Sequence, residues 1–245
     1  MPFTFSHPAA VLPFGRTASK RLSMTGLVIG SMTPDFEYFL RMREVSTYSH
    51  TWTGLLWFDL PLGIMLVIFY ELWVKGPLID SLTPGLYKRL FVFKGFRRDY
   101  TVAYFAAIFF SVAIGAASHI LWDGFTHPTG YFVQHIPRLH RMILFHGRRY
   151  YVFSLLQHLS TIAGGVFILL VISSLPKKID LSVSAREQRG AKGILAYWLQ
   201  IILVTVVFVV IRLAMGLGLH QYADLIINVI DGGLIGVIVA SLLAA

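Results

Sequence analysis

The chain has 245 residues, of which 56% are hydrophobic and 13% are charged, and its formal net charge is +9. Soluble proteins carry about 25% charged residues, so this composition excludes an ordinary soluble domain and predicts a protein with several membrane spans. The basic residues lie between apolar segments. We therefore expect membrane lipids as partners, through anionic headgroups, and no nucleic acid.

The sequence contains no cysteine, which excludes disulfides and thiolate metal ligands. Prolines at positions 2, 8 and 13 interrupt the start of the chain, and we expect no cleavable signal peptide there. The region before the first long apolar segment is too polar to cross a membrane. Its short apolar stretch LSMTGLVIGSM ends at Pro34. We expect helices here that pack against the membrane bundle.

Hydropathy predicts five membrane-spanning helices, at residues 54–74, 101–122, 151–174, 194–215 and 222–243. Each is near the ~20 residues that cross about 30 Å of hydrocarbon. Between the first two spans, PGLYKRLFVFKGFRRD alternates aromatic and basic residues, which is typical of an interfacial amphipathic helix. The predicted fold class is all-α: a polytopic integral membrane helical bundle with additional N-terminal and interfacial helices.

A polar linker at residues 176–193 divides the chain into residues 1–175 and a C-terminal helical hairpin at residues 194–245. In the hairpin, Asp224, Asn228 and Asp231 form a polar stripe, with Arg212 on the preceding span. Ionisable residues inside a membrane are functional candidates by default. A structural ion pair between the two hairpin helices is the more economical interpretation.

Span counting predicts that two histidine- and carboxylate-rich segments share one side of the membrane. With five spans, the residues before the first span and those between the second and third must lie on the same side. Lys and Arg are slightly more numerous on the opposite side. The positive-inside rule therefore favours a multi-pass protein of the cell membrane whose site faces away from the cytoplasm.

The stretch SHILWDGFTH, residues 118–127, provides the first candidate ligands. His119, Asp123 and His127 are spaced at i, i+4 and i+8, so they lie on one helix face with about 6 Å between neighbours. Ionisable residues at membrane depth are costly unless they are paired or bound to a metal. The full set of candidate metal ligands combines both segments: His7, Asp35, His50, His119, Asp123 and His127.

Imidazole and carboxylate ligands suit a divalent cation, and Zn²⁺ is the expected cofactor, as one or two ions. Ser6, Ser49 and Ser118 stand beside three of the histidines and are candidates for orienting them. The alternative is that the histidines are separate interfacial residues, each hydrated or capping a helix. His119 and Asp123 together argue against that alternative, because two ionisable residues share one helix face.

Further residues are candidates for catalysis and substrate binding. Asp35 and Glu37, which follow Pro34, are the candidates for orienting an attacking water. Guanidinium groups bind phosphate well, so the basic residues after the second span are expected to hold an anionic headgroup. The candidate substrate-binding residues are His135, Arg138, Arg141, His146 and Arg148. His158, inside the third span, either faces the site or bonds a neighbouring helix.

Four blocks in order resemble the DUF4184 family of bacterial membrane proteins: MPFTFSHPAAVLPF, GSMTPDFEYF, SHTWTG and SHILWDGFTHPTGYFVQHIP. The resemblance covers roughly residues 1–175. More distantly, the arrangement is similar to the YdjM-type membrane-bound metal-dependent hydrolases and to the zinc-dependent phospholipase C and P1 nuclease fold.

The phospholipase C resemblance implies a particular division of the ligands. Asp35, His50, His119 and Asp123 would share one ion, and Asp123 would bridge to a second ion that is also bound by His7. A third ion in that fold requires a His-x-x-x-Glu pair. Here the residue four positions after His158 is an isoleucine, so we expect at most two ions.

The sequence therefore predicts a membrane-embedded metal-dependent hydrolase, acting on an ester or phosphoester that is lipid-linked, through a zinc-activated water. Two other classes stay open. One is a non-enzymatic membrane protein with a structural metal or a polar clamp. The other is a small transporter, for which a continuous polar stripe through the spans is expected.

Overall fold

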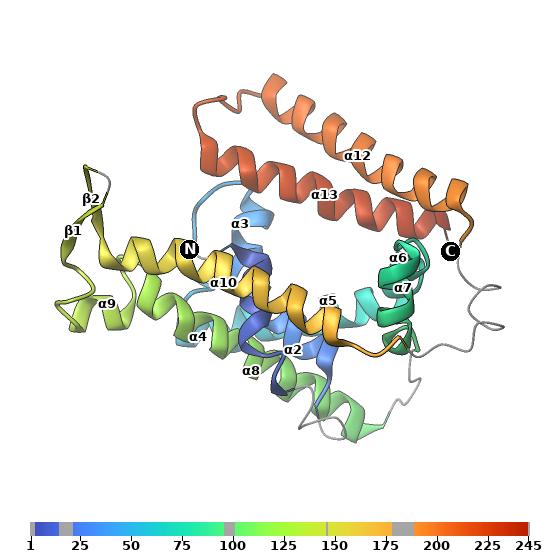
Figure 1. The fold of residues 1–245 in the computed structure, drawn as a ribbon, viewed down its shortest axis with the longest axis horizontal. Helices are drawn as coiled ribbons and strands as arrows, with labels where there is room; N and C mark the ends of the chain where they lie inside the picture. Colours follow the sequence, from blue (N-terminus) through green and yellow to red (C-terminus); the bar gives the residue numbers. More distant parts are fainter. Residues whose placement is uncertain (1–2, 15–21, 96–100, 146, 178–188, 245) are drawn as a thin grey trace. The chain divides into compact units, whose positions relative to one another are not determined.

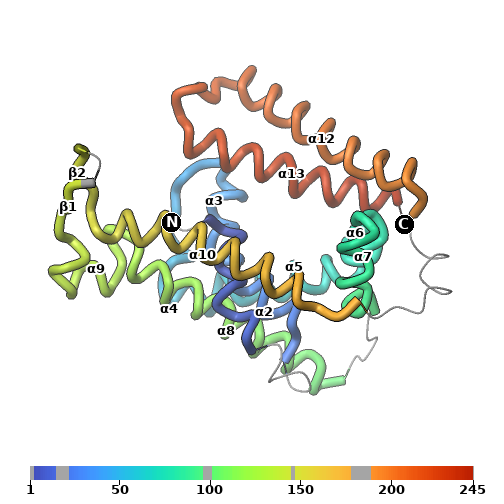
Figure 2. Tube along the Cα trace, viewed as in Figure 1, coloured from blue at the N-terminus to red at the C-terminus, as the bar shows by residue number. Residues whose placement is uncertain are grey.

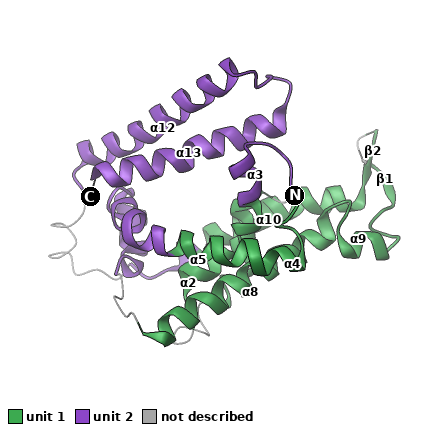
Figure 3. Ribbon diagram, turned by 180° about the vertical axis from the view of Figure 1, so that it is seen from behind, with its two compact units in different colours: residues 1–35, 47–67, 100–171 green, residues 36–46, 68–99, 172–245 purple. Residues whose placement is uncertain are grey.

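The computed structural model describes residues 3–14, 22–95, 101–145, 147–177 and 189–244 (Figure 1). The described chain is mostly helical with almost no sheet, which confirms the all-α prediction. It forms two compact units (Figure 3). Unit 1 comprises Met1–Asp35, Thr47–Val67 and Tyr100–Val171, and unit 2 comprises Phe36–Ser46, Ile68–Asp99 and Ile172–Ala245.

Five helical segments in the described residues are long and apolar enough to cross a membrane. Each contains most of one predicted span, so the prediction of a multi-pass membrane protein is supported by both length and composition. The segments are Trp52–Asp80, Val102–His135, Val152–Ser174, Ala191–Ala214 and Tyr222–Ala244.

Unit 1 is built around one long helix, α8 (Val102–Thr126), against which the short helix α2 (Met24–Gly30) packs. Ser23 caps α2 by accepting from the Gly26 N–H, and its own N–H donates to the Ser111 hydroxyl of α8. The other elements of unit 1 are η1 (Thr4–Ala10), η2 (Thr33–Asp35), α4 (Trp52–Gly54), η3 (Leu55–Asp59), α9 (Tyr131–His135) and α10 (Val152–Ser174), together with most of α5 (Leu60–Phe69). In the trace of Figure 2 the N-terminal segment, in dark blue, runs beside α2 and α8.

The first spanning segment contains a π-helical turn, η3, immediately before Pro61. A proline has no N–H and its ring clashes with the preceding turn, so a regular helix cannot continue through it without adjustment. The Leu60 N–H instead bonds the Leu55 carbonyl five residues back. The wider turn accommodates Pro61 and keeps the helix continuous.

A short β-hairpin, absent from the sequence prediction, follows α9. Strand β1 (Met142–Phe145) pairs antiparallel with β2 (Arg148–Tyr151), and Phe145 lies opposite Arg148. The connection therefore has two residues. Gly147, the second of them, has a φ of 74°, the left-handed conformation that tight hairpin turns require and glycine adopts readily.

Unit 2 contains α3 (Phe36–Arg41), η4 (Tyr70–Val74), α6 (Lys75–Asp80), α7 (Pro84–Leu90) and η5 (Phe91–Phe93), and the hairpin of α12 (Ala191–Ala214) and α13 (Tyr222–Ala244). The two hairpin helices pack closely, because a Cβ on Gly236 would lie 2.9 Å from the Ile201 carbonyl oxygen. The Tyr197 and Ser241 hydroxyls are hydrogen-bonded at 2.9 Å. Small residues permit such close approach between membrane helices.

The predicted polar stripe of α13 acts as a clamp inside unit 2. The Arg212 Nε donates to the Asn228 Oδ1 at 2.7 Å, and the Asn228 Nδ2 donates to the Met42 carbonyl at 3.0 Å. The Asp224 carboxylate accepts from the Glu44 N–H at 2.8 Å. These bonds hold the loop after α3, in which Met42 has a positive φ of 54°. Asp224 and Asn228 therefore have a structural role, and the contact between the two hairpin helices is a hydrogen bond from Arg212 to Asn228.

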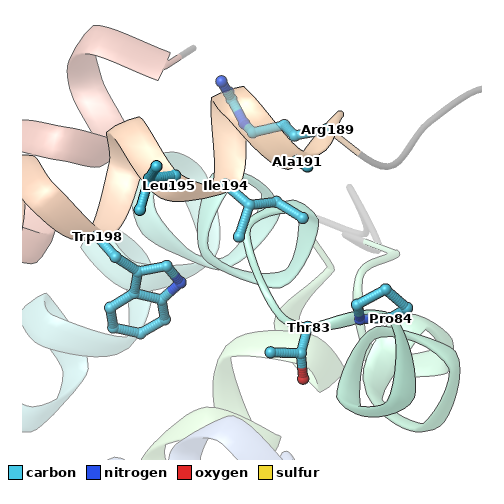
Figure 4. A pocket seen from close by; sticks show the side chains of 7 residues that line it. All are labelled: Thr83, Pro84, Arg189, Ala191, Ile194, Leu195 and Trp198. Atoms are coloured by element: carbon cyan, nitrogen blue, oxygen red, sulfur yellow. The ribbon is translucent and has the colours of Figure 1, made fainter.

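Unit 2 also has a hollow of about 390 Å³ at the start of α12 (Figure 4). The Trp198 indole N–H donates to the Ser81 carbonyl, which fixes one wall. Most of the lining is apolar, and Arg189 is its one charged residue; the lining residues are Thr83, Pro84, Arg189, Ala191, Ile194, Leu195 and Trp198. None of the candidate ligands lines this hollow.

The two ends of α8 are expected to lie on opposite sides of the membrane. The helix has 25 residues, and at 1.5 Å per residue it is about 37 Å long, which exceeds the ~30 Å hydrocarbon core. The chain has no cysteine, so Val102→Cys and Thr129→Cys each introduce a single thiol. Both positions are exposed, and they lie near the two ends of α8. A membrane-impermeant thiol reagent should label only one of them in intact cells, and both after permeabilisation. Equal labelling of both in intact cells would show that α8 does not span.

Candidate metal centre

Four separate elements of unit 1 bring candidate ligands together. The 3₁₀ segment η1 carries His7, η2 ends at Asp35, and His50 lies in the turn before α4. The helix α8 contributes His119 and Asp123, which the i, i+4 spacing places on one buried face. All five residues belong to unit 1.

Four ligand atoms form a set with nearly equal spacings. The His50 Nε2 lies 3.4 Å from the Asp35 Oδ1 and 3.5 Å from the Asp123 Oδ2. The His119 Nε2 lies 3.5 Å and 3.4 Å from the same two oxygens. These distances exceed the roughly 2.7–3.2 Å of N–H···O hydrogen bonds. They are close to the spacing of about 3.3–3.4 Å between neighbouring ligand atoms that bonds of 2.0–2.1 Å give around a zinc ion.

A second ligand group shares Asp123. The His7 Nε2 lies 3.6 Å from the Asp123 Oδ1, whereas the other oxygen of that carboxylate faces His50 and His119. The His7 ring stacks on the His119 ring, with 3.6 Å between centroids, and meets the edge of Trp122. Ligand atoms of His7, His119 and Asp123 all lie within 4.8 Å of one another. The two oxygens of Asp123 thus face different groups.

The cluster is buried, and its polar atoms lack ordinary partners. His7, Asp35, His119 and Asp123 are all buried. Among the described residues, both oxygens of each carboxylate, both His7 nitrogens and the His119 Nε2 form no hydrogen bond. Native proteins rarely leave buried polar atoms unsatisfied, and a set of lone pairs that converge is what a cation satisfies. The donor set therefore fits a divalent ion.

Neighbouring groups orient two of the imidazoles. The His119 Nδ1 lies 2.7 Å from the Ser31 carbonyl, which accepts its proton and leaves the Nε2 lone pair directed at the cluster. The Ser49 hydroxyl lies 3.0 Å from the His50 Nδ1. The His50 side chain is 18% exposed, whereas those of Asp35 and His119 are fully buried. Access to the cluster from outside is therefore on the His50 side.

At His7 and Asp35, electrostatics favour the protonation states that bind a metal. Burial, reinforced by the neighbouring His119, lowers the pKa of His7 to about 3, so its imidazole is neutral at pH 7. Burial alone would raise the pKa of Asp35, but the nearby imidazoles of His119 and His50 hold it well below its usual range. A neutral imidazole and an ionised carboxylate are the forms that coordinate metal ions.

His127, the third member of the helical spacing, lies beside the cluster. It follows the last residue of α8, and its ring centroid is 6.4 Å from that of His50. Its Nε2 is buried and forms no hydrogen bond to the described residues. Neither ligand group contains it.

Glu37 lies in unit 2 and is held there by other side chains. Its carboxylate accepts from the Arg41 Nε at 2.9 Å and from the Ser46 hydroxyl at 3.1 Å. Of the two carboxylates that follow Pro34, Asp35 is the one that the structure brings into a ligand group.

The proposed substrate-binding residues lie beyond the end of α8. His135 ends α9, where its Nδ1 lies 2.7 Å from the Tyr131 carbonyl. Arg138, Arg141 and Arg148 are exposed, and His146 lies outside the described residues. His158 is exposed on α10 and belongs to neither ligand group. The structure thus brings five of the six candidate metal ligands into the two groups and leaves the basic residues exposed.

The chain matches the family model described as domain of unknown function DUF4184 over residues 1–242. It belongs to the DUF4184 family. The match extends well beyond residue 175, so the C-terminal hairpin is part of the region that the family shares. Comparisons with curated proteins and with solved structures gave no match.

Close packing of α2 on α8 should be necessary for this centre. A Cβ on Gly115 would lie 2.5 Å from the Leu27 carbonyl oxygen and 2.6 Å from the Ser31 nitrogen, so only glycine lets α2 bring the Ser31 carbonyl to His119. We expect Gly115→Ala to lower the free energy of unfolding by about 1–3 kcal/mol, the usual cost of overpacking. Gly165→Ala, where a Cβ meets nothing within 4 Å, is the control. Denaturant unfolding in detergent should separate the two, and equal stability would refute the packing argument.

Proposed function

We propose that this protein is a membrane-embedded metal-dependent hydrolase that acts on a lipid-linked ester or phosphoester. The proposal rests on one observation: the Nε2 atoms of His50 and His119 each lie 3.4–3.5 Å from an oxygen of Asp35 and an oxygen of Asp123. No comparison supports the more distant hydrolase resemblances, so the support comes from geometry. Zn²⁺ accepts mixed imidazole and carboxylate ligands at this spacing.

The residues divide into a closed set and an open one. Asp35, His50, His119 and Asp123 would supply four ligand atoms to one ion, since the His50 and His119 Nε2 atoms each lie 3.4–3.5 Å from an oxygen of both carboxylates. On the other side, His7 and the Asp123 Oδ1 offer two atoms to a second ion. Fewer protein ligands leave coordination positions for water, as in catalytic zinc sites, and a substrate would reach them past His50, which is partly exposed. A divalent ion held there supplies Lewis acidity and a water of lowered pKa.

Asp35 is the better candidate for orienting the attacking water. Its Oδ1 faces His50 and His119, whereas its Oδ2 is buried without a hydrogen bond to the described residues. That oxygen is available to accept a proton from water. Glu37, in contrast, already accepts from Arg41 and Ser46.

The location of the cluster supports a substrate from the membrane. Asp123 lies one turn before the end of α8, and His50 lies two residues before the first spanning segment begins. The cluster is therefore at the ends of two spans, where headgroups meet the hydrocarbon. The exposed Arg138, Arg141 and Arg148 follow α8 and would bind an anionic headgroup or phosphate. The charge distribution favours the extracytoplasmic side for this face.

One observation favours a second candidate, a non-enzymatic protein with a structural metal. Four protein ligands around one ion are typical of structural zinc sites. Metal content together with a turnover screen on phospholipids and on soluble phosphodiesters distinguishes the two. Metal without turnover on any of them would favour the structural candidate. A transporter has less support, since two residues of the stripe of α13, Asp224 and Asn228, are occupied in the clamp of unit 2.

Asp123→Asn should lower the metal content more than substitution of a ligand that faces only one of the two groups, because the two Asp123 oxygens face one group each. We expect purified wild-type protein to contain one to two Zn²⁺ per chain, and the variant to contain less than one and to lose turnover. Asp80→Asn is the control, since Asp80 pairs with Lys94 at 2.9 Å outside the cluster. The measurement is elemental analysis at equal folded fraction. Wild-type metal content in Asp123→Asn would contradict the assignment.

Ser49→Ala should weaken the centre without removing a ligand. The Ser49 hydroxyl orients the His50 ring, and loss of such a contact costs roughly 10- to 100-fold in metal affinity. Ser118→Ala is the matched control, because the Ser118 hydroxyl donates to the Gly115 carbonyl within α8. Competition with a zinc chelator measures both variants. Equal affinities would show that the hydroxyl does not position His50.

A further inference from the structure

The segment that carries His7 is anchored on α10 at one point. The Phe3 N–H donates to the Thr161 Oγ1 at 3.0 Å, and the Ser6 hydroxyl donates to the Thr161 carbonyl at 3.0 Å. The Thr161 hydroxyl in turn donates to the Gln157 carbonyl at 3.1 Å, which fixes its lone pairs toward Phe3. A single residue of α10 therefore bonds η1 on both sides of its first turn.

Gly164 completes this anchor by letting the two backbones approach. A Cβ on Gly164 would lie 2.9 Å from both the Ser6 Cβ and the Ser6 carbonyl oxygen. Of the described residues of α10, only Phe153 and Gly164 are buried. We call Thr161 and Gly164 the α10 notch. The notch is the place where α10 is covered, and it is covered by the residue directly before His7.

On its other face, His7 contacts α8. Its ring stacks on His119, and its Nε2 lies 3.6 Å from the Asp123 Oδ1. A 3₁₀ segment of seven residues has little stability of its own, because its hydrogen bonds are poorly aligned and few. The position of His7 beside Asp123 therefore depends on the contacts that η1 makes with α10, which are those of the α10 notch.

We propose that the α10 notch is a positioning site that seats η1 and so controls binding of the second metal ion, the one assigned to His7 and the Asp123 Oδ1. The inference rests on the proposed metal centre. The four ligand atoms of the first ion come from η2, the turn before α4, and α8, none of which bonds Thr161. Loss of the notch should therefore affect the second ion and spare the first.

Two adjacent glycines provide the test. Gly164→Ala inserts a methyl group against Ser6, whereas Gly165→Ala adds the same group where nothing lies within 4 Å. Zinc stoichiometry and chelator competition are measured on the full-length protein in detergent. We expect Gly164→Ala to weaken the second ion by about 10- to 100-fold, the range for residues that support metal ligands, while the first ion binds as in wild type. Gly165→Ala should bind both ions as wild type does.

Thr161 gives an independent pair of variants should Gly164→Ala fail to fold. Thr161→Val keeps the shape but removes the hydroxyl that accepts from Phe3, whereas Thr161→Ser retains it. We expect weakened binding of the second ion in Thr161→Val and wild-type binding in Thr161→Ser. Equal binding in Gly164→Ala and Gly165→Ala, or equal loss of both ions in Gly164→Ala, would overturn the proposal.

Hydrogen exchange of the amides in η1 separates this inference from the proposed function. The amide hydrogens of η1 should exchange faster in Gly164→Ala than in Gly165→Ala, whether or not metal is present. Wild-type protein that binds no zinc would refute the metal centre. The exchange rates would still show whether the α10 notch holds η1 in place. Unchanged exchange in Gly164→Ala would show that the notch does not hold η1.

Discussion

The organisation of unit 1 depends on the burial of two carboxylates next to three imidazoles. Each buried charge loses several kcal/mol of hydration unless it is paired and hydrogen-bonded. Asp35 and Asp123 are buried, and their oxygens meet imidazole nitrogens at 3.4–3.6 Å instead of at hydrogen-bond distance. Attraction among these groups offsets part of the desolvation cost, and a cation between them would offset more. The elements around the cluster have to be rigid enough to hold these groups at that separation.

That rigidity comes from backbone contacts that glycine permits. Gly115 lets α2 approach α8 until the Ser31 carbonyl meets the His119 Nδ1, and Gly164 lets α10 approach η1 beside His7. The Ser31 carbonyl fixes His119 directly, whereas His7 is positioned through the bonds of Phe3 and Ser6 to Thr161. Main-chain atoms on packed helices have few alternative positions, so they orient imidazoles more strictly than mobile side chains can.

The sequence predicts those parts of the fold and centre that follow from local periodicity and from span counting. The i, i+4 spacing places His119 and Asp123 together, and the parity of the spans brings the N-terminal segment to the same side of the membrane. The π-helical turn before Pro61, the β-hairpin and the contacts of Ser31 and Thr161 are different in kind. The π-helical turn reflects the local effect of Pro61, whereas the others depend on pairings between residues up to 158 positions apart or on two-residue turn geometry, and hydropathy gives no signal for any of them. His-Gly between two short apolar or aromatic runs was the one available indication of the hairpin.

The shared carboxylate gives the centre an asymmetry. On one side of Asp123, its Oδ2 and the Asp35 Oδ1 both lie 3.4–3.5 Å from the His50 and His119 Nε2 atoms, so three elements contribute to this set and no single segment can leave without breaking it. On the other side, one histidine on a short 3₁₀ segment faces the remaining oxygen. Affinity rises with the number of fixed ligands, so the first position would hold an ion strongly, and the second would exchange its ion and its solvent ligands more readily. In a centre with two ions, the reactive position would therefore be the one beside His7, and the ion held by the first set would maintain the geometry of Asp123.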